Sequence, residues 1–304
     1  MVRTALFGNS RPGGLFSIVD VTSTTGNLFF VDSGNTANGG DTAGFGNDPD
    51  APFLTIDFAV GQCTANNGDR IYVMPGHAEV VSAAAGLALD VAGISIIGLG
   101  AGTDTPTVTL DTADTADVDV DAANVTVDNI HFKAGFADIA VCLDVNATDF
   151  TCRRCRFTEA ANNQNFLVCV QDAAANASDR ITVEDCYALQ DDAANTHFIN
   201  FAGTPKGCIV RRNTLLGDWG TMAIGGAGVI TFCVINDNVI YNAASTVDGC
   251  INLAATATGM VMRNLCGGAA AQANGVTATA CAIAENYYGV ISEDLSAILD
   301  PIAT

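Results

Sequence analysis

The chain has few basic residues and few aromatic residues. Only 12 of its 304 residues are Lys or Arg, against 33 Asp and Glu, which gives a formal net charge of −21. Nucleic acids and anionic membranes both attract basic surfaces. The sequence therefore predicts no direct nucleic-acid partner and no membrane partner. The excess of carboxylates is typical of a soluble protein.

Long apolar runs are also missing. No segment approaches the roughly 18 apolar residues that a membrane-spanning helix needs. The residues after Met1 contain no unbroken apolar stretch of the kind found in a secretory signal. On this basis we expect synthesis in the cytoplasm.

The chain does contain a repeated phrase. Eight-residue windows, with apolar residues or Cys at positions one and three and mostly polar residues at four and five, recur about every 27 residues. This alternation has the period of a β-strand, and repetition at this interval is typical of a solenoid. The windows are Val125–Phe132, Phe150–Phe157, Ile181–Ala188, Cys208–Leu215, Cys233–Ile240 and Met260–Gly267.

A second apolar run lies between consecutive windows. These runs cover residues 139–145, 166–172, 197–203, 221–227 and 249–255. Two or three short strands per repeat predict an all-β fold, a parallel β-helix. Hydrophobic residues make up 49% of the chain and aromatic residues 7%, so small and β-branched side chains are expected to fill a narrow core.

Three regions follow from this pattern. Residues 1–50 are predicted to form an N-terminal arm, a first strand and a polar loop. Residues 51–290 are predicted to form the parallel β-helix, with a capping helix near 54–62 that begins at Thr55. Residues 291–304 are expected to form a C-terminal tail or cap.

The start of the second region resembles a known family. Residues 52–60 (PFLTIDFAV) and 68–79 (GDRIYVMPGHAE) are similar to the phrases PFxTIxxAv and GDxIxVxPGxYxE of the pectate-lyase-like right-handed β-helix superfamily. His77 stands where an aromatic residue is common. The resemblance implies a right-handed coil with a helical N-terminal cap. It implies no activity, because this superfamily includes lyases, hydrolases, adhesins and phage proteins.

Alignment of the windows places opposite charges in neighbouring coils. Such neighbours stabilise adjacent strands by about 0.2–1 kcal/mol each. We therefore favour a structural role over an arginine-lined groove for an acidic sugar. The fourth positions are Asp128, Arg153, Glu184, Arg211, Asn236 and Arg263, and the fifth are Asn129, Arg154, Asp185, Arg212, Asp237 and Asn264. At the sixth position, Asn213 and Asn238 predict a stacked asparagine ladder.

The 11 cysteines also align. Cys155 is predicted to stack on Cys186, Cys208 on Cys233, and Cys142 on Cys169. Adjacent strands lie about 4.8 Å apart, a spacing that a disulfide tolerates. The preferred interpretation is a set of reduced thiols that fill the core.

Two groups of carboxylates are candidate sites. In an extended strand, Asp117, Asp119 and Asp121 share one face and could bind calcium, although a solvated strand face is the preferred interpretation. No other cofactor is expected. Glycoside hydrolysis needs two carboxylates beside a sugar. The candidates for it are Glu159, Asp191, Asp192 and Asp218, but the only Trp is Trp219, and His77, His131 and His197 lie on separate segments.

These observations predict a non-enzymatic structural protein of a bacteriophage virion. Segment 27–63 also resembles phage structural proteins of the same superfamily. The expected form is a homotrimer that acts as a capsid decoration (cement) protein or a tail-associated β-helix, with the major capsid protein or another virion protein as partner. Two alternatives stay open. One is a polysaccharide lyase or hydrolase of the tailspike depolymerase type, and the other is an adhesin that binds a host surface glycan.

Overall fold

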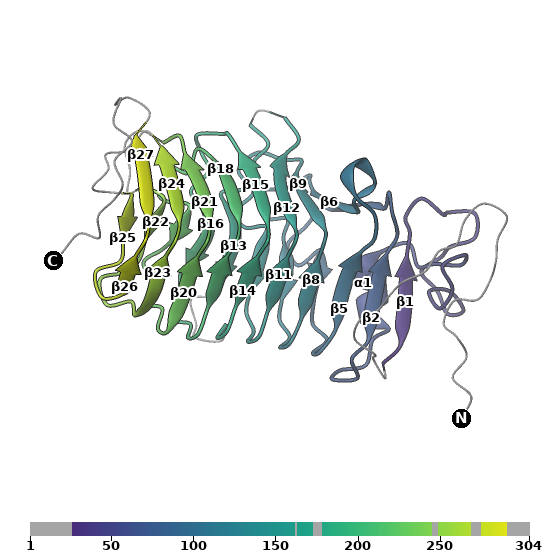
Figure 1. Cartoon of the computed structure of the whole chain (residues 1–304). Coiled ribbons are helices and arrows are strands. Elements are labelled where there is room, and N and C mark those ends of the chain that lie inside the picture. The colour runs from purple at the N-terminus through teal and green to yellow at the C-terminus, as the bar shows by residue number, and fades with distance from the viewer. Residues whose placement is uncertain (1–25, 162, 173–177, 245–248, 269–274, 291–304) are drawn as a thin grey trace.

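The computed structural model describes residues 26–161, 163–172, 178–244, 249–268 and 275–290. Within these residues the chain winds into a right-handed parallel β-helix of about eight coils. The coils stack side by side along one axis, from β1 at the N-terminal end to β27 at the C-terminal end (Figure 1). The predicted all-β class and parallel β-helix are confirmed.

Three parallel sheets form the walls of the coil. We call them sheet 1, sheet 2 and sheet 3, in the order in which each coil passes through them. Sheet 1 consists of β1 (Leu28–Val31), β2 (Arg70–Val73), β5 (Ser95–Gly98), β8 (Thr126–Asp128), β11 (Thr151–Arg153), β14 (Thr182–Glu184), β17 (Ile209–Arg211), β20 (Cys233–Asn236), β23 (Gly259–Met262) and β26 (Ala282–Ala284).

Sheets 2 and 3 follow the same coil order. Sheet 2 consists of β3 (Ala78–Val81), β6 (Thr107–Leu110), β9 (His131–Ala134), β12 (Arg156–Glu159), β15 (Tyr187–Gln190), β18 (Thr214–Gly217), β21 (Val239–Asn242), β24 (Leu265–Gly268) and β27 (Tyr287–Val290). Sheet 3 consists of β4 (Leu87–Ala88), β7 (Val118–Val120), β10 (Leu143–Val145), β13 (Val168–Asp172), β16 (His197–Phe201), β19 (Ile224–Gly225), β22 (Ile251–Asn252) and β25 (Val276–Thr277).

Each repeated window covers two strands instead of one. The chain leaves sheet 1 at the fourth position, bends over two residues, and enters sheet 2. The bend requires a left-handed backbone at the fifth position, where Arg154, Asp185 and Arg212 have φ values of 54°, 56° and 54°. The short bend places sheets 1 and 2 directly next to each other in every coil.

The predicted register is wrong by one residue in the sixth window. Gly259 pairs with Cys233, so Met260 lies beside Val234. Arg263 therefore aligns with Asp237, and Asn264 aligns with Asn238. The sequence pattern missed this position because Gly259 has no side chain, and a Cβ there would lie 2.2 Å from the carbonyl oxygen of Cys233.

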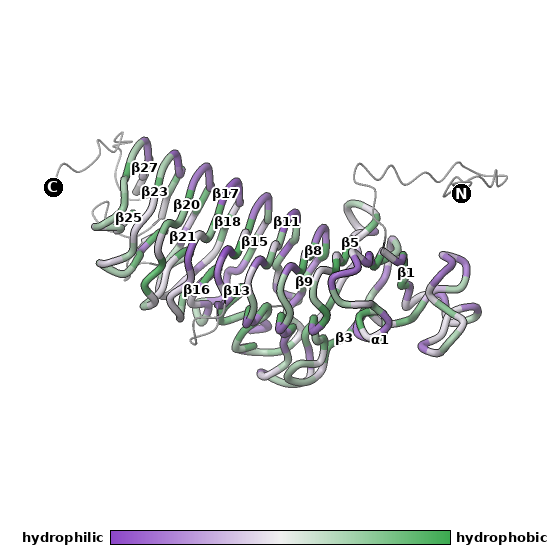
Figure 2. Tube along the Cα trace, turned by 90° about the horizontal axis from the view of Figure 1, so that it is seen from below, coloured by the Kyte–Doolittle hydropathy of each residue, from purple (hydrophilic) through white to green (hydrophobic). Residues whose placement is uncertain are grey.

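Stacked apolar side chains fill the interior. Phe132, Phe157 and Phe198 are fully buried, and their ring centroids lie 5.4 Å and 5.6 Å apart in succession. Hydrophilic and hydrophobic stretches alternate along each coil (Figure 2). Each coil buries its apolar residues against the next, as expected for a solenoid.

One short α-helix lies at the N-terminal end. Helix α1 (Ile56–Gly61) begins after Thr55, whose side-chain oxygen accepts a hydrogen bond from the backbone N–H of Phe58 at 3.3 Å. The helix packs against β1, β2 and β4 and buries Ile56, Ala59 and Val60. A single 3₁₀ turn, η1, covers Gly102–Asp104. Among the described residues, no helix is long and apolar enough to span a membrane. The predicted arm (apart from residues 26–50) and the C-terminal tail lie outside the described residues.

Candidate functional site

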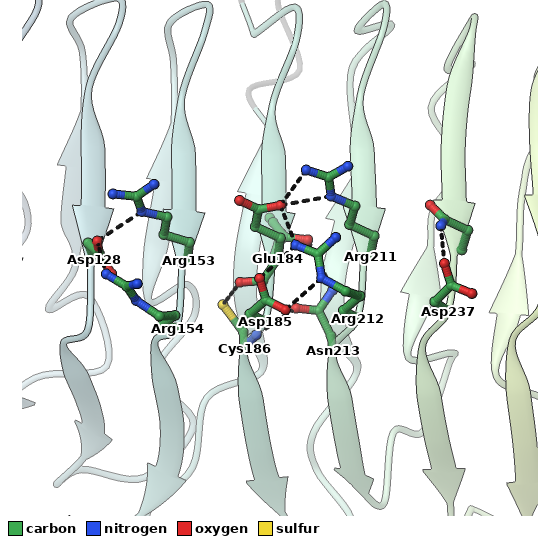
Figure 3. A network of polar contacts seen from close by, with 12 residues as sticks. Asp128, Arg153, Arg154, Glu184, Asp185, Cys186, Arg211, Arg212, Asn213 and Asp237 are labelled. Atoms are coloured by element: carbon green, nitrogen blue, oxygen red, sulfur yellow. Dashed lines mark hydrogen bonds and ion pairs between the residues drawn. The ribbon is translucent and has the colours of Figure 1, made fainter. Parts of the chain in front are cut away.

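The charged ladders form ion pairs between neighbouring coils on sheet 1 and its bend (Figure 3). Asp128 is buried and accepts hydrogen bonds from Arg153 Nε at 2.9 Å and Arg154 Nε at 2.8 Å. Glu184 accepts from Arg211 Nε at 2.7 Å and from Arg212 at 2.9 Å. These arginines are bound to carboxylates of their own chain.

The same pairing continues along the bend. Arg212 also binds Asp185 at 2.7 Å, and Arg263 binds Asp237 at 2.7 Å. Hydrogen bonds from these arginines lower the pKa of Asp185 and of Asp237 below the ordinary value for Asp. The charges of these arginines are therefore balanced by carboxylates of the same face.

The asparagine ladder is longer than predicted. Asn213 and Asn238 lie in consecutive coils, and Asn264 and Asn286 continue the row. The side-chain oxygens of Asn238, Asn264 and Asn286 each accept from the backbone and side-chain N–H groups of the preceding member, at 2.9–3.1 Å, and that of Asn213 accepts from the backbone N–H of Cys186. The ladder satisfies the polar groups of the buried bend and has no free group for a ligand.

The predicted cysteine pairs lie in register as aligned. Leu143 pairs with Val170, so Cys142 and Cys169, one residue earlier on each strand, face each other. The same offset places Cys155 beside Cys186 and Cys208 beside Cys233. All 11 cysteines are free thiols. Cys152 joins Cys155 and Cys186 in one buried group, with 3.8 Å between the sulfurs of Cys152 and Cys186.

The acidic residues on sheet 3 bond to separate partners and not to a common point. Asp117 accepts from the backbone of Ala85 at 2.5 Å, whereas Asp121 accepts from Asn146 at 3.0 Å. Asp119 lies in register with Asp144, and burial together with the neighbouring carboxylates raises the pKa of Asp119 to about 6. In the described parts of the chain, no three His, Cys, Asp or Glu side chains are placed to hold a metal ion. Calcium binding stays a prediction.

The four carboxylates named for glycoside hydrolysis lie where sheet 2 ends in three consecutive coils, at the corner between sheets 2 and 3. Glu159 ends β12 and is half-buried. Its Oε1 accepts from the backbone N–H of Asp192 at 3.2 Å and from Asn195 Nδ2 at 3.0 Å. Burial and a hydrogen bond with the carboxyl group of Asp191 raise the pKa of Glu159 to about 7. The side chain is therefore about half protonated at neutral pH.

The other carboxylates of the corner are in different surroundings. Asp191 is exposed, and Asp218 follows β18 in the next coil, where its backbone N–H donates to the carbonyl of Gln190 at 2.8 Å. Asp192 accepts from the backbone N–H groups of Asn163 and Ala194. The sequence named these residues singly, and only the coil register brings them together.

Buried amides fix this corner. Asn195 is 1% exposed and receives a hydrogen bond on its Oδ1 from Asn165 Nδ2 at 3.0 Å. Asn165 in turn accepts from the backbone of Asp138 at 3.0 Å. These amides connect three coils and hold Glu159 in one orientation.

A cleft of about 550 Å³ opens on sheet 3, and the four carboxylates of the corner are not part of its lining. Two residues of its lining lie close in sequence to Asn195 and its partner. His197 lies two positions after Asn195. Thr221 follows Gly220, whose backbone N–H donates to the carbonyl of Asn195 at 2.7 Å. Burial lowers the pKa of His197 to about 4, so the imidazole is neutral. The lining holds no Asp, Glu, Lys or Arg. Its polar residues are His197, Asn200, Thr221, Asn252, Thr277 and Thr279.

The tryptophan and the other two histidines named from the sequence are buried or bonded to neighbouring side chains. Trp219 is fully buried and cannot stack on a sugar at the surface. His77 is buried and contacts Glu79 at 3.2 Å, and His131 contacts Thr158 at 2.7 Å.

Known proteins similar to this chain are found among solved structures. No protein-family model and no curated protein sequence matches the chain. Among solved structures, a rhamnogalacturonan lyase matches with 12% identity and a TM-score of 0.49 over 91% of this chain and 90% of that one. A GH136 lacto-N-biosidase from Eubacterium ramulus matches with 11% identity and a TM-score of 0.38 over 87% of this chain and 68% of that one.

Both titles name carbohydrate-processing enzymes, and the prediction of a non-enzymatic protein is withdrawn. The comparisons do not bear out the predicted resemblance to phage proteins. At these identities and TM-scores the likeness concerns the fold, so a function has to be argued from the side chains of this chain.

Proposed function

We propose that the protein hydrolyses a glycan at the corner between sheets 2 and 3. The observation that carries this proposal is the pair of carboxyl groups formed by Glu159 and Asp191, in which Glu159 has a pKa raised to about 7. A carboxylic acid that keeps its proton near neutral pH, beside a second carboxylate, is the requirement for general acid catalysis of glycoside cleavage.

Each carboxylate has a separate role in this proposal. Glu159 donates its proton to the oxygen of the leaving sugar. Asp191 is exposed and, as the hydrogen-bond partner of Glu159, helps that residue keep its proton. Asp218 takes a proton from the attacking water. Glu159 and Asp218 lie two coils apart, about 9.6 Å from strand to strand, and an inverting enzyme likewise holds a water between two separated carboxyl groups.

The lining of the cleft favours a neutral substrate. Amide and hydroxyl groups bind sugar hydroxyls, whereas four carboxylates at the corner repel an acidic sugar. The lining of the cleft contains no Lys or Arg that could act as the base for elimination from a uronate. Hydrolysis of a neutral oligosaccharide therefore fits the site better than elimination from an acidic one.

A reducing-end assay on a panel of neutral and acidic polysaccharides tests this function. We expect new reducing ends from a neutral glycan, without the unsaturated ends that a lyase produces. The Glu159→Gln variant keeps the shape of the side chain and should lose at least about 100-fold in rate. Glu184→Gln, which alters a carboxylate of similar burial on sheet 1, is the matched control and should keep full activity.

Two outcomes would count against the proposal. Equal activity of the Glu159→Gln variant and the parent would remove Glu159 from the reaction. Cleavage with unsaturated ends would show that the reaction is elimination.

A further inference from the structure

The outer face of sheet 2 carries no carboxylate. Along its nine strands, the outward positions alternate with the buried ones, from Ala78 and Val80 in β3 to Tyr287 and Gly289 in β27. None of these outward residues is Asp or Glu, although the chain has 33 of them. The outer positions of sheets 1 and 3, by contrast, include Asp128, Glu184 and Asp144.

This acid-free face also collects exposed apolar side chains. Nine large apolar side chains of the described residues are exposed, and six of them lie on sheet 2: Val80, Leu189, Val239, Tyr241, Leu265 and Tyr287. Their exposed fractions run from 40% to 62%. A concentration of this kind on one face is typical of an interaction surface.

Two cations at the N-terminal half of the face have no carboxylate partner among the described ion pairs. Lys133 lies on β9, and the guanidinium carbon of Arg156 lies 5.7 Å above the ring of Tyr187. Five arginines of sheet 1 and its bend, by contrast, are bound to carboxylates of the same chain. The outer face of sheet 2 is therefore a part of the described surface that an acidic partner can approach without meeting carboxylates.

We propose that the outer face of sheet 2 packs against a second copy of this chain. Copies with a net charge of −21 repel one another wherever carboxylates meet, and this face avoids that contact. Nine strands about 4.8 Å apart and about 13 Å wide give a flat area of about 500 Å². Protruding side chains and the adjoining loops add to this flat area and bring the buried surface toward the roughly 800 Å² per partner of a stable interface.

An anionic polysaccharide is the other occupant that these side chains could suit. We favour the second copy because the cations are confined to β9 and β12, whereas the apolar residues continue over five further strands. An anionic polymer would gain little from those strands. This proposal does not depend on glycan cleavage at Glu159, because one is tested by molecular mass and the other by release of reducing ends.

Light scattering coupled to gel filtration tests the proposal. The parent should have a mass that is a multiple of 31.1 kDa. Tyr241→Glu and Leu265→Glu each place a carboxylate on the exposed face and should weaken the association at least 10-fold, with an unchanged circular dichroism spectrum. Two variants are used so that the result does not depend on the folding of one. Phe232→Glu, at the most exposed apolar residue outside sheet 2, is the control and should assemble like the parent.

Three results would overturn the proposal. The first is a parent that stays at 31.1 kDa at about 100 μM, a concentration at which even a weak interface of micromolar affinity is occupied. The second is an assembly that Phe232→Glu disrupts and Tyr241→Glu does not, since the interface would then lie on sheet 1. The third is a monomer that binds polygalacturonate and loses this binding in Lys133→Gln, since the face would then be a glycan-binding surface.

Discussion

Val183 illustrates how strictly single positions inside the coil are constrained. Its side chain is fully buried in β14, between Cys152 in the coil before and Val210 in the coil after. Every direction from its Cβ meets another side chain of the stack. A polar group at this position has no water and no hydrogen-bond partner.

Replacement of Val183 by Asp should therefore lower the stability by about 3 to 5 kcal/mol, the typical cost of an unpaired buried charge. Thermal melting followed by circular dichroism measures the effect. The Val183→Ala variant, which removes volume without adding charge, should cost less, about 1 to 2 kcal/mol. A Val183→Asp variant that melts like the parent would mean that this residue does not face the core.

At the scale of the element, the bend between sheets 1 and 2 depends on its asparagines. Asn238 accepts from the backbone and side chain of Asn213 and donates to the carbonyl of Val210 and to Asn264. Its removal leaves several buried polar groups without partners, and each such group costs about 1–3 kcal/mol.

We expect Asn238→Ala to destabilise the protein by about 2 to 4 kcal/mol, measured by urea unfolding. Asn236→Ala changes the same residue type two positions earlier, outside the ladder, and should have a small effect. If the two variants unfold at the same urea concentration, the ladder is not what holds the bend.

The sequence predicted those elements whose signal repeats from coil to coil. The period of the windows was sufficient for the parallel β-helix, and Asn213 and Asn238 were sufficient for the ladder. The bend within each window escaped notice because Arg154 and Arg212 are unusual residues for a left-handed backbone. The sixth window was misaligned because Gly259 replaces an apolar side chain with none.

The carboxylate corner could not be assembled from sequence because its members belong to three coils of unequal length. Glu159 aligns with Gln190, which places Asp191 one residue further along its coil. Asp218 in the next coil aligns with Asp191. A signal was present: the residue at the end of a sheet 2 strand, or just after it, is acidic in three consecutive coils. It becomes visible only once the strands of sheet 2 are separated from those of sheet 1.

At the scale of the whole molecule, titration of the carboxylates sets the dependence of stability on pH. In the folded state the pKa is raised to about 7 for Glu159 and about 6 for Asp119 and Asp172, in each case mainly by burial. The folded state then binds protons that the unfolded chain has released, so stability falls as the pH rises from about 4 to 7. Hydrogen bonds from the arginines lower the pKa of Asp185 and Asp237, and that contribution is lost below about pH 4.

The buried histidines act in the opposite sense. Burial lowers the pKa of His131 and His197 to about 4, so stability falls as the pH drops from about 6.5 to 4. We therefore expect the carboxylate contribution to appear in a comparison of variants. Relative to the parent, Asp119→Asn should have a higher melting temperature at pH 7.5 than at pH 4.5, and melting curves at about pH 3, 4.5 and 7.5 measure this. The same pH dependence in the variant and the parent would contradict the raised pKa of Asp119.

The ion pairs described above all run in one direction along the solenoid. In every pair the arginine belongs to the later coil and reaches back to a carboxylate of the coil before, as Arg153 does to Asp128, Arg180 to Asp149 and Arg263 to Asp237. A chain that grows from its N-terminus therefore presents negative charge at its unfinished edge until the next arginine arrives. Two incomplete chains meeting edge to edge repel each other, so the order of charges guards the open sheets against aggregation while they are being built.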